Sequence, residues 1–131
     1  MSISRRTFMA ASAAVAMAAV SGAARADGTV NVYSYRQPTL IDPLFEAFTK
    51  ATGITVRTVF AESGLIERLA QEGRNSPADV LLTADVGRLV EAVSRDLAQP
   101  VESAAINDKV PANLRDAGNL WFGLTMRARV A

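Results

Sequence analysis

The sequence predicts a doubly wound α/β fold, with a largely parallel sheet flanked by helices, and three observations lead to this class. Apolar runs rich in β-branched residues alternate three times with segments of helical periodicity between residues 29 and 96. The third run, Val80–Thr83, is apolar throughout, which is typical of parallel strands covered on both faces. Three β-α units in succession imply right-handed crossovers within one sheet.

The first unit comprises a predicted strand over Thr29–Tyr35 and a predicted amphipathic helix over Leu40–Thr52. Thr39 followed by Asp42 suits the start of this helix, and Gly53 suits a left-handed cap after its last turn. The apolar residues expected on its buried side are Leu40, Leu44, Phe45 and Phe48.

The second and third units repeat this plan. Ile54–Ala61 is predicted as a strand, Ser63 as the N-cap of the next helix, and Gly73 as the residue that ends it. That helix is expected to bury Leu65, Ile66 and Leu69. After the strand Val80–Thr83, Asp85 is predicted to cap a helix that buries Leu89, Val90 and Val93.

After Asp96 the pattern loosens into a loop-rich connection that leads to a predicted last strand, Trp121–Val130. This strand runs into the end of the chain without a turn or a cap. We therefore expect the 131-residue sequence to be a fragment of a longer protein.

The N-terminus has the pattern of an export signal. Arg5-Arg6 precede an alanine-rich apolar run, Met9–Val20, and a small-residue cleavage pattern follows. This arrangement resembles a bacterial twin-arginine signal over residues 1–26, cleaved after Ala26. A membrane-anchoring helix is the alternative, but the run is shorter than the ~20 apolar residues of a membrane span. Residues 27–131 are therefore expected to be the mature part and to reside in the periplasm.

Composition excludes several functions. The chain has no cysteine and no histidine, so it cannot form a Ser-His-Asp triad, a thiolate metal site or a histidine-bound zinc site. Its 14 basic and 13 acidic residues give a net charge of +1 and are scattered along the sequence. No nucleic-acid partner is predicted, because such surfaces gain affinity by concentrating positive charge.

Candidate binding residues follow the predicted strands, because open α/β sheets bind ligands at the carboxyl ends of their strands. Arg36 offers a planar donor fork and Gln37 an amide just before a helix, where a small oxyanion such as carbonate could be held. Tyr35 and Asp85 lie at the same edge. The structural alternatives are an Arg36 paired with a surface acid, a Tyr35 packed in the core, and an Asp85 that only caps a helix.

Three blocks of the sequence are distinctive: "VYSYRQPTLIDPLFEAFTKATGITV", "NSPADVLLTADVGRL" and "VPANLRDAGNLWFGLTMRARV", which together cover most of the mature chain. They resemble the periplasmic ferric-iron-binding proteins that serve ABC-type importers. The resemblance implies the N-terminal lobe of a two-lobed, type II-like periplasmic binding protein, which closes over Fe(III) and delivers it to an inner-membrane permease. It also implies a monomer and a binding protein that is not an enzyme.

Within that family, "YSYRQP" is similar to a subgroup in which Arg36 and Gln37 would hold a synergistic carbonate or similar anion. Tyr35 and Asp85 would then line the cleft. The resemblance places the metal ligands, tyrosines that include an adjacent pair, beyond Ala131, so no metal ligand is expected in this chain. Phenolate oxygen suits Fe(III), which prefers hard donors.

Other functions remain open from the residues alone. The same fold could bind a polyamine, thiamine or another oxyanion-bearing solute, and a second lobe without paired tyrosines would favour this alternative. A small α/β enzyme or nucleotide-binding domain is a further alternative. Against it, the first predicted strand is followed by Tyr-Arg-Gln-Pro instead of a glycine-rich phosphate loop, and no nucleophile-base pair can be assembled.

Overall fold

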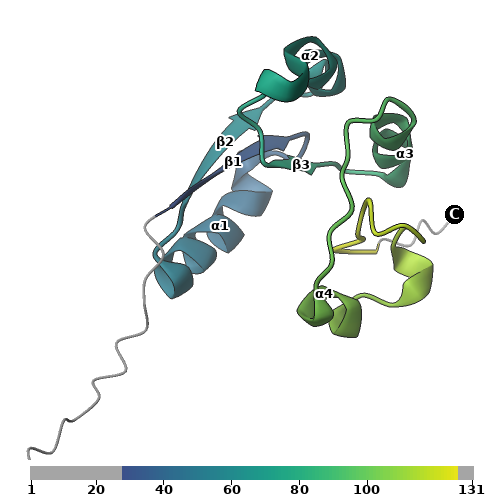
Figure 1. Cartoon of the computed structure of the whole chain (residues 1–131). Helices are drawn as coiled ribbons and strands as arrows, with labels where there is room; N and C mark the ends of the chain where they lie inside the picture. The colour runs from purple at the N-terminus through teal and green to yellow at the C-terminus, as the bar shows by residue number, and fades with distance from the viewer. Residues whose placement is uncertain (1–27, 127–131) are drawn as a thin grey trace, which may run out of the picture.

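The computed structural model describes residues 28–126 of the chain, and it has the predicted α/β class with a parallel sheet and flanking helices (Figure 1). Its strands and helices are β1 (Thr29–Ser34), α1 (Pro38–Thr52), β2 (Thr55–Phe60), α2 (Leu65–Glu72), β3 (Val80–Leu82), α3 (Val86–Ser94) and α4 (Ala104–Lys109). Two short 3₁₀ turns, η1 (Gly73–Asn75) and η2 (Ala112–Leu114), complete the elements.

The sheet has the strand order β2-β1-β3, and both pairings are parallel. β1 is central, with Tyr33 opposite Val59 on one side and Leu81 on the other. The chain passes from β1 outward to β2 through α1, and then back across β1 to β3 through α2. Right-handed crossovers in opposite directions place α1 and α2 on opposite faces of the sheet (Figure 1).

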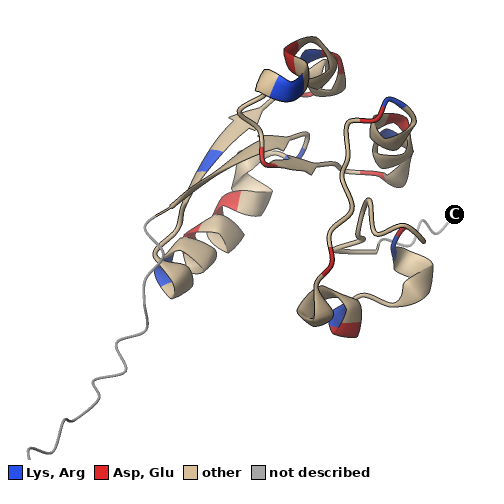
Figure 2. Cartoon of the chain, in the orientation of Figure 1, with Lys and Arg blue, Asp and Glu red and all other residues tan. Residues whose placement is uncertain are grey.

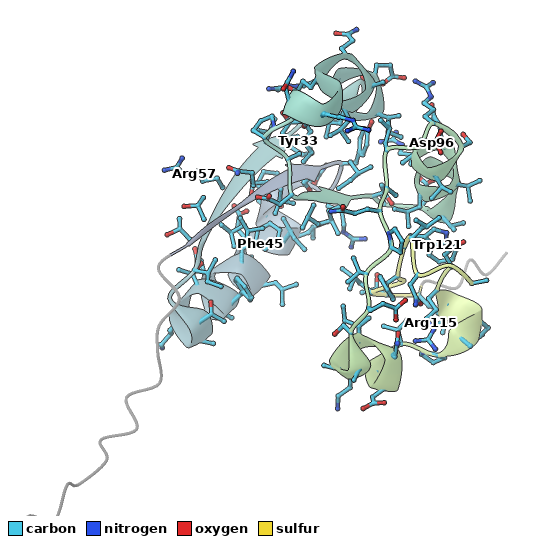
Figure 3. The ribbon with its side chains drawn as sticks, viewed as in Figure 1. Tyr33, Phe45, Arg57, Asp96, Arg115 and Trp121 are labelled. Atoms are coloured by element: carbon cyan, nitrogen blue, oxygen red, sulfur yellow. The ribbon has the colours of Figure 1, made fainter. Side chains whose placement is uncertain are left out.

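The core lies mainly between β1 and α2. Tyr33 and Tyr35 point to the same face of β1 and pack with Leu65 and Ile66 of α2, and all four side chains are buried. Figure 3 shows Tyr33 at this junction of strand and helix. The predicted buried residues of α2 are confirmed, since Leu69 also packs against this cluster.

The first helix differs from the prediction at its start and on its buried face. α1 begins at Pro38 with Gln37 as N-cap, because proline is favoured in a first turn where its missing N–H costs no hydrogen bond. Its buried residue is Ile41, whereas the predicted stripe is largely exposed, with 65% for Leu40, 58% for Leu44 and 40% for Phe48. The helix is apolar on more than one side, so periodicity alone did not select the face.

The third unit is less covered than predicted. Val80 is 45% exposed because, within residues 28–126, β3 pairs only with β1 and forms an edge of the sheet. On α3 the fully buried residue is Ala92, while Val90 is 54% exposed. Leu81 and Leu82 are half-buried, so β3 is partly covered within the described residues and the predicted parallel pairing is present.

The last described segment lies apart from the three strands (Figure 1). Its α4 is capped by Ser103, and beyond η2 the backbone forms one antiparallel bridge, Arg115 with Phe122. Arg115 and Trp121 lie in this segment (Figure 3). The described part of the predicted strand Trp121–Val130 is thus not a strand, and its final residues, like the predicted export signal, lie outside the described residues.

None of the helices formed by residues 28–126 has both the length and the apolar character needed to cross a membrane.

Candidate functional site

The candidate residues follow β1 and β3, where the order of the strands reverses. β1 connects outward to β2, while its other neighbour, β3, belongs to the later crossover. The strand ends are tied together, because Tyr35 N–H donates to the Leu82 carbonyl at 2.9 Å and Ala61 N–H to the Ser34 carbonyl at 3.1 Å. In open α/β sheets this switch in strand order is where ligands bind.

Arg36 leaves β1 in a turn that Ser34 fixes. The Ser34 hydroxyl is fully buried; it accepts a hydrogen bond from Arg36 N–H and donates one to the Arg36 carbonyl, both at 3.0 Å. The ion pairs among residues 28–126 are Arg68–Glu72, Arg88–Asp85 and Arg95–Glu91, so Arg36 has no acidic partner in that part of the chain. The next residue, Gln37, is exposed at the N-cap of α1.

Tyr35 has a structural role at the same edge. Its side chain is 9% exposed, and its hydroxyl accepts a hydrogen bond from Ile66 N–H at 2.9 Å. Ile66 lies in the first turn of α2, so Tyr35 satisfies a helix N–H that has no partner within the helix. The sequence predicted Ser63 as the cap of this helix, which is wrong: Gly64 is the N-cap, with a φ of 83°, and offers no side chain.

Asp85 is the N-cap of α3, as predicted. Its Oδ1 accepts from Arg88 N–H at 3.1 Å, and Thr83 donates its hydroxyl to the Asp85 carbonyl at 2.7 Å. Its Oδ2 lies 3.8 Å from Arg88 Nε. The carboxylate therefore lies within ion-pair distance of a cation on its own helix.

Sequence analysis missed Arg88. Its guanidinium lies 3.9 Å above the centroid of the Tyr35 ring and donates to the Glu62 carbonyl at 3.3 Å. The only sequence signal was its position three residues after the N-cap Asp85, where ion pairing along a helix is common. A cavity of about 170 Å³ opens beside it, lined also by Tyr35, Ser63, Gly64 and Ile66 and by the carboxylates of Glu67 and Glu91.

A larger hollow of about 480 Å³ lies between α1 and β2. It includes the first residues of β2, Thr55 and Val56, so it is remote from the candidate residues.

The other tyrosine is part of a hydrogen-bonded cluster away from the strand ends. Tyr33 donates its hydroxyl to the Glu72 carboxylate at 2.9 Å, and that carboxylate also accepts from Ser76 and from Arg68, both at 2.7 Å. Burial and the bond to Glu72 raise the pKa of Tyr33, while the bonds from Ser76 and Arg68 lower the pKa of Glu72. The Tyr33 hydroxyl is therefore engaged with Glu72 within this cluster.

No metal-binding cluster forms in the described part of the chain, where no three histidine, cysteine, aspartate or glutamate side chains gather to hold an ion. Figure 2 shows acidic and basic residues interspersed along the helices of the described part of the chain. Arg36 and Gln37 carry donor groups of the kind that bind small anions, and interspersed charges of both signs do not favour extended polyanions.

Comparison with known proteins gives a family and a set of solved relatives. Residues 33–129 match the family described as bacterial extracellular solute-binding protein. The chain is 40% identical over 132 aligned residues to iron uptake protein A2 of Synechocystis sp., an alignment that covers 98% of this chain and 37% of that protein.

Two solved structures share the fold. Ferric iron-binding protein A of Mannheimia haemolytica, in an open conformation, matches with a TM-score of 0.73 and 53% identity over 75% of this chain and 31% of that one. The FutA (IdiA) protein of Trichodesmium, in complex with iron and citrate, matches with a TM-score of 0.69 and 45% identity over 73% of this chain and 31% of that one. These matches confirm the predicted type II-like binding-protein fold, and the chain spans about a third of each relative's length.

Proposed function

Because the chain belongs to the family of bacterial extracellular solute-binding proteins, we propose that it supplies one wall of a cleft that captures ferric iron together with an anion for an ABC importer. The observation that carries this proposal is its likeness, over 98% of its length to a protein named for iron uptake and over 75% to a protein named for ferric-iron binding. Residues 27–131 would form the N-terminal lobe of such a protein, in the periplasm and as a monomer. Its role is binding and delivery to the permease, without catalysis.

The proposed anion contacts are Arg36 and Gln37. The Arg36 guanidinium has no acidic partner among residues 28–126, and its planar fork matches the geometry of carbonate or of a citrate carboxylate. Gln37 adds an amide at the start of the 15-residue α1, whose positive end favours an anion. Tyr35 and Asp85 would form the wall beside them, with the charge of Asp85 offset by Arg88.

The iron itself would be held by oxygen ligands from outside the described residues. Tyr33 and Tyr35 are the only tyrosines of the chain, and both hydroxyls are engaged, with Glu72 and with Ile66 N–H. A bound anion would link the lobe to the metal, because the anion oxygens that do not contact the protein are hard donors of the kind that Fe(III) prefers. The lobe would therefore meet the metal through the anion.

The test is a titration of the ¹⁵N-labelled full chain with sodium bicarbonate, citrate and ferric citrate, followed by amide spectra. We expect shifts from both anions at Arg36 and Gln37, and paramagnetic broadening from ferric citrate centred on the same residues. Arg36→Ala should remove these responses. Arg57→Ala is the matched control, because Arg57 is an exposed arginine on β2 whose side chain points away from the sheet (Figure 3).

A chain that gives no response at Arg36 or Gln37 to any of these three ligands would contradict the proposal. Spermidine, thiamine and inorganic phosphate serve as the competing solutes. Shifts at Arg36 and Gln37 from one of these, and not from citrate or bicarbonate, would favour the same fold with a different ligand.

A further inference from the structure

We propose that Arg88 is the positioning residue of the candidate anion site, a single side chain that holds the loops after all three strands in one arrangement. Its guanidinium stacks on Tyr35 after β1, donates to the Glu62 carbonyl after β2, and pairs with Asp85 after β3. The role in anion binding rests on the proposed function. The tethering of the loops follows from the contacts alone.

Each contact restrains a different degree of freedom. The 3.9 Å distance from the guanidinium carbon to the Tyr35 centroid lies well within cation–π range and fixes the ring from one side. The bond of the Tyr35 hydroxyl with Ile66 N–H fixes its far end. The bond to Glu62, at 3.3 Å, holds the loop that leads from β2 into α2.

Arg88 acts on the anion contacts through Tyr35 instead of touching the anion. Tyr35 directly precedes Arg36, and the Ser34 hydroxyl already fixes the backbone of Arg36 from the other direction. Because Arg88 and Ile66 hold Tyr35, and Ser34 holds the Arg36 backbone, the direction in which the chain leaves β1 is restrained at both residues. The backbone that carries the donors of Arg36 and Gln37 is thereby set before the ligand arrives, which lowers the ordering cost of binding.

The chemistry of arginine is required for these simultaneous contacts. A planar guanidinium can stack on a ring with its face while its edge donates to a carbonyl and lies within ion-pair distance of a carboxylate, whereas an ammonium is a point charge without a face. Arg68 stacks on Tyr33 at 4.8 Å, but its ion pair is with Glu72 of its own helix, so it ties α2 to β1 only.

The test compares Arg88→Met and Arg88→Lys with Arg95→Met in the ¹⁵N-labelled full chain. Arg95 is the matched control, because it is the C-cap of the same helix, α3, and its ion pair is with Glu91 of that helix. Its side chain is 42% exposed, against 36% for Arg88. The three readouts are amide chemical shifts, hydrogen exchange at Ile66 N–H, and the citrate dissociation constant.

We expect Arg88→Met to shift amides in all three loops, to speed exchange at Ile66, and to weaken citrate binding about tenfold, as loss of an orienting partner commonly does. Arg88→Lys keeps the charge but should give amide shifts, Ile66 exchange and citrate affinity similar to those of Arg88→Met. Arg95→Met should shift only amides of α3 and leave citrate affinity within about twofold of wild type.

Amide shifts confined to α3 in Arg88→Met would overturn the tethering role. Full rescue by lysine would also overturn it, because charge would then suffice without stacking. If Arg88→Met does not fold, Arg88→Lys decides by the same shifts. A wild-type chain that ignores citrate and bicarbonate refutes the proposed function and with it the anion role, while the amide comparison still decides whether Arg88 tethers the loops.

Discussion

Replacement of Tyr35 by phenylalanine isolates one hydrogen bond between β1 and α2. Phenylalanine keeps the buried ring and the surface on which Arg88 stacks, and it removes only the hydroxyl that accepts from Ile66 N–H at 2.9 Å. Ile66 is 2% exposed, so its N–H would be left in a place that water reaches poorly. The N-cap residue, Gly64, has no side chain that could replace the lost acceptor.

The expected cost is about 1.5 kcal/mol. A buried donor left without a partner costs roughly 1–3 kcal/mol, and loss of a helix cap typically about 1 kcal/mol. For about 100 ordered residues each kcal/mol lowers the melting temperature by roughly 4–8 °C. Urea unfolding followed by circular dichroism measures this difference in the free energy of unfolding between wild type and Tyr35→Phe.

Ser63→Ala is the matched control, because Ser63 is the residue that the sequence alone assigns to this cap. In the structure its side chain makes no capping bond, so its replacement should change stability by less than about 0.5 kcal/mol. A cost for Ser63→Ala equal to or above that for Tyr35→Phe would refute the assignment of the cap to Tyr35.

Three further predictions concern single groups. Burial and the bond to Glu72 raise the pKa of Tyr33, so Tyr33 ionises in the unfolded chain first and the free energy of unfolding should fall as the pH rises above 10.0. In urea unfolding at several pH values, Tyr33→Phe should show a smaller fall over this range. The bond from Ser76, more than that from Arg68, lowers the pKa of Glu72. The contribution of Glu72 to the free energy of unfolding is therefore present above its ordinary pKa of 4.5 and is lost as the pH falls through the lower pKa of the folded chain. In Glu72→Gln, stability should fall less steeply with decreasing pH in acid, as measured by urea unfolding. Asp85→Ala removes the acceptor of Arg88 N–H and should cost about 1 kcal/mol in thermal unfolding, and no measurable loss would show that another group caps α3.

The local features of this fold were predictable because their causes lie within a few residues. The Asp85 cap on α3 and the left-handed Gly53 after α1, with a φ of 81°, depend on residues three or four positions away. The same holds for the three β-α units, which follow from apolar periodicity and breaking residues. The site residues Arg36 and Gln37 could be proposed because strand ends are where such sheets bind ligands.

Other features depend on residues that are distant in sequence. Tyr35 caps α2 across 31 positions and Arg88 reaches Glu62 across 26, and no local pattern encodes either contact. The buried face of α1 was mistaken because two adjacent apolar stripes run along one helix, and only the packing against the sheet selects Ile41 over Leu40 and Leu44.

By itself, the sequence determined the α/β class, the order of the elements and the residues that follow each strand, because these arise from local backbone preference and from the spacing of apolar side chains. Only the tertiary structure decided that β1 is central, which helix face is buried, and that one arginine joins the three loops. Those outcomes depend on which surfaces meet, and that is settled by close packing and by the need to satisfy buried polar groups across the whole fold.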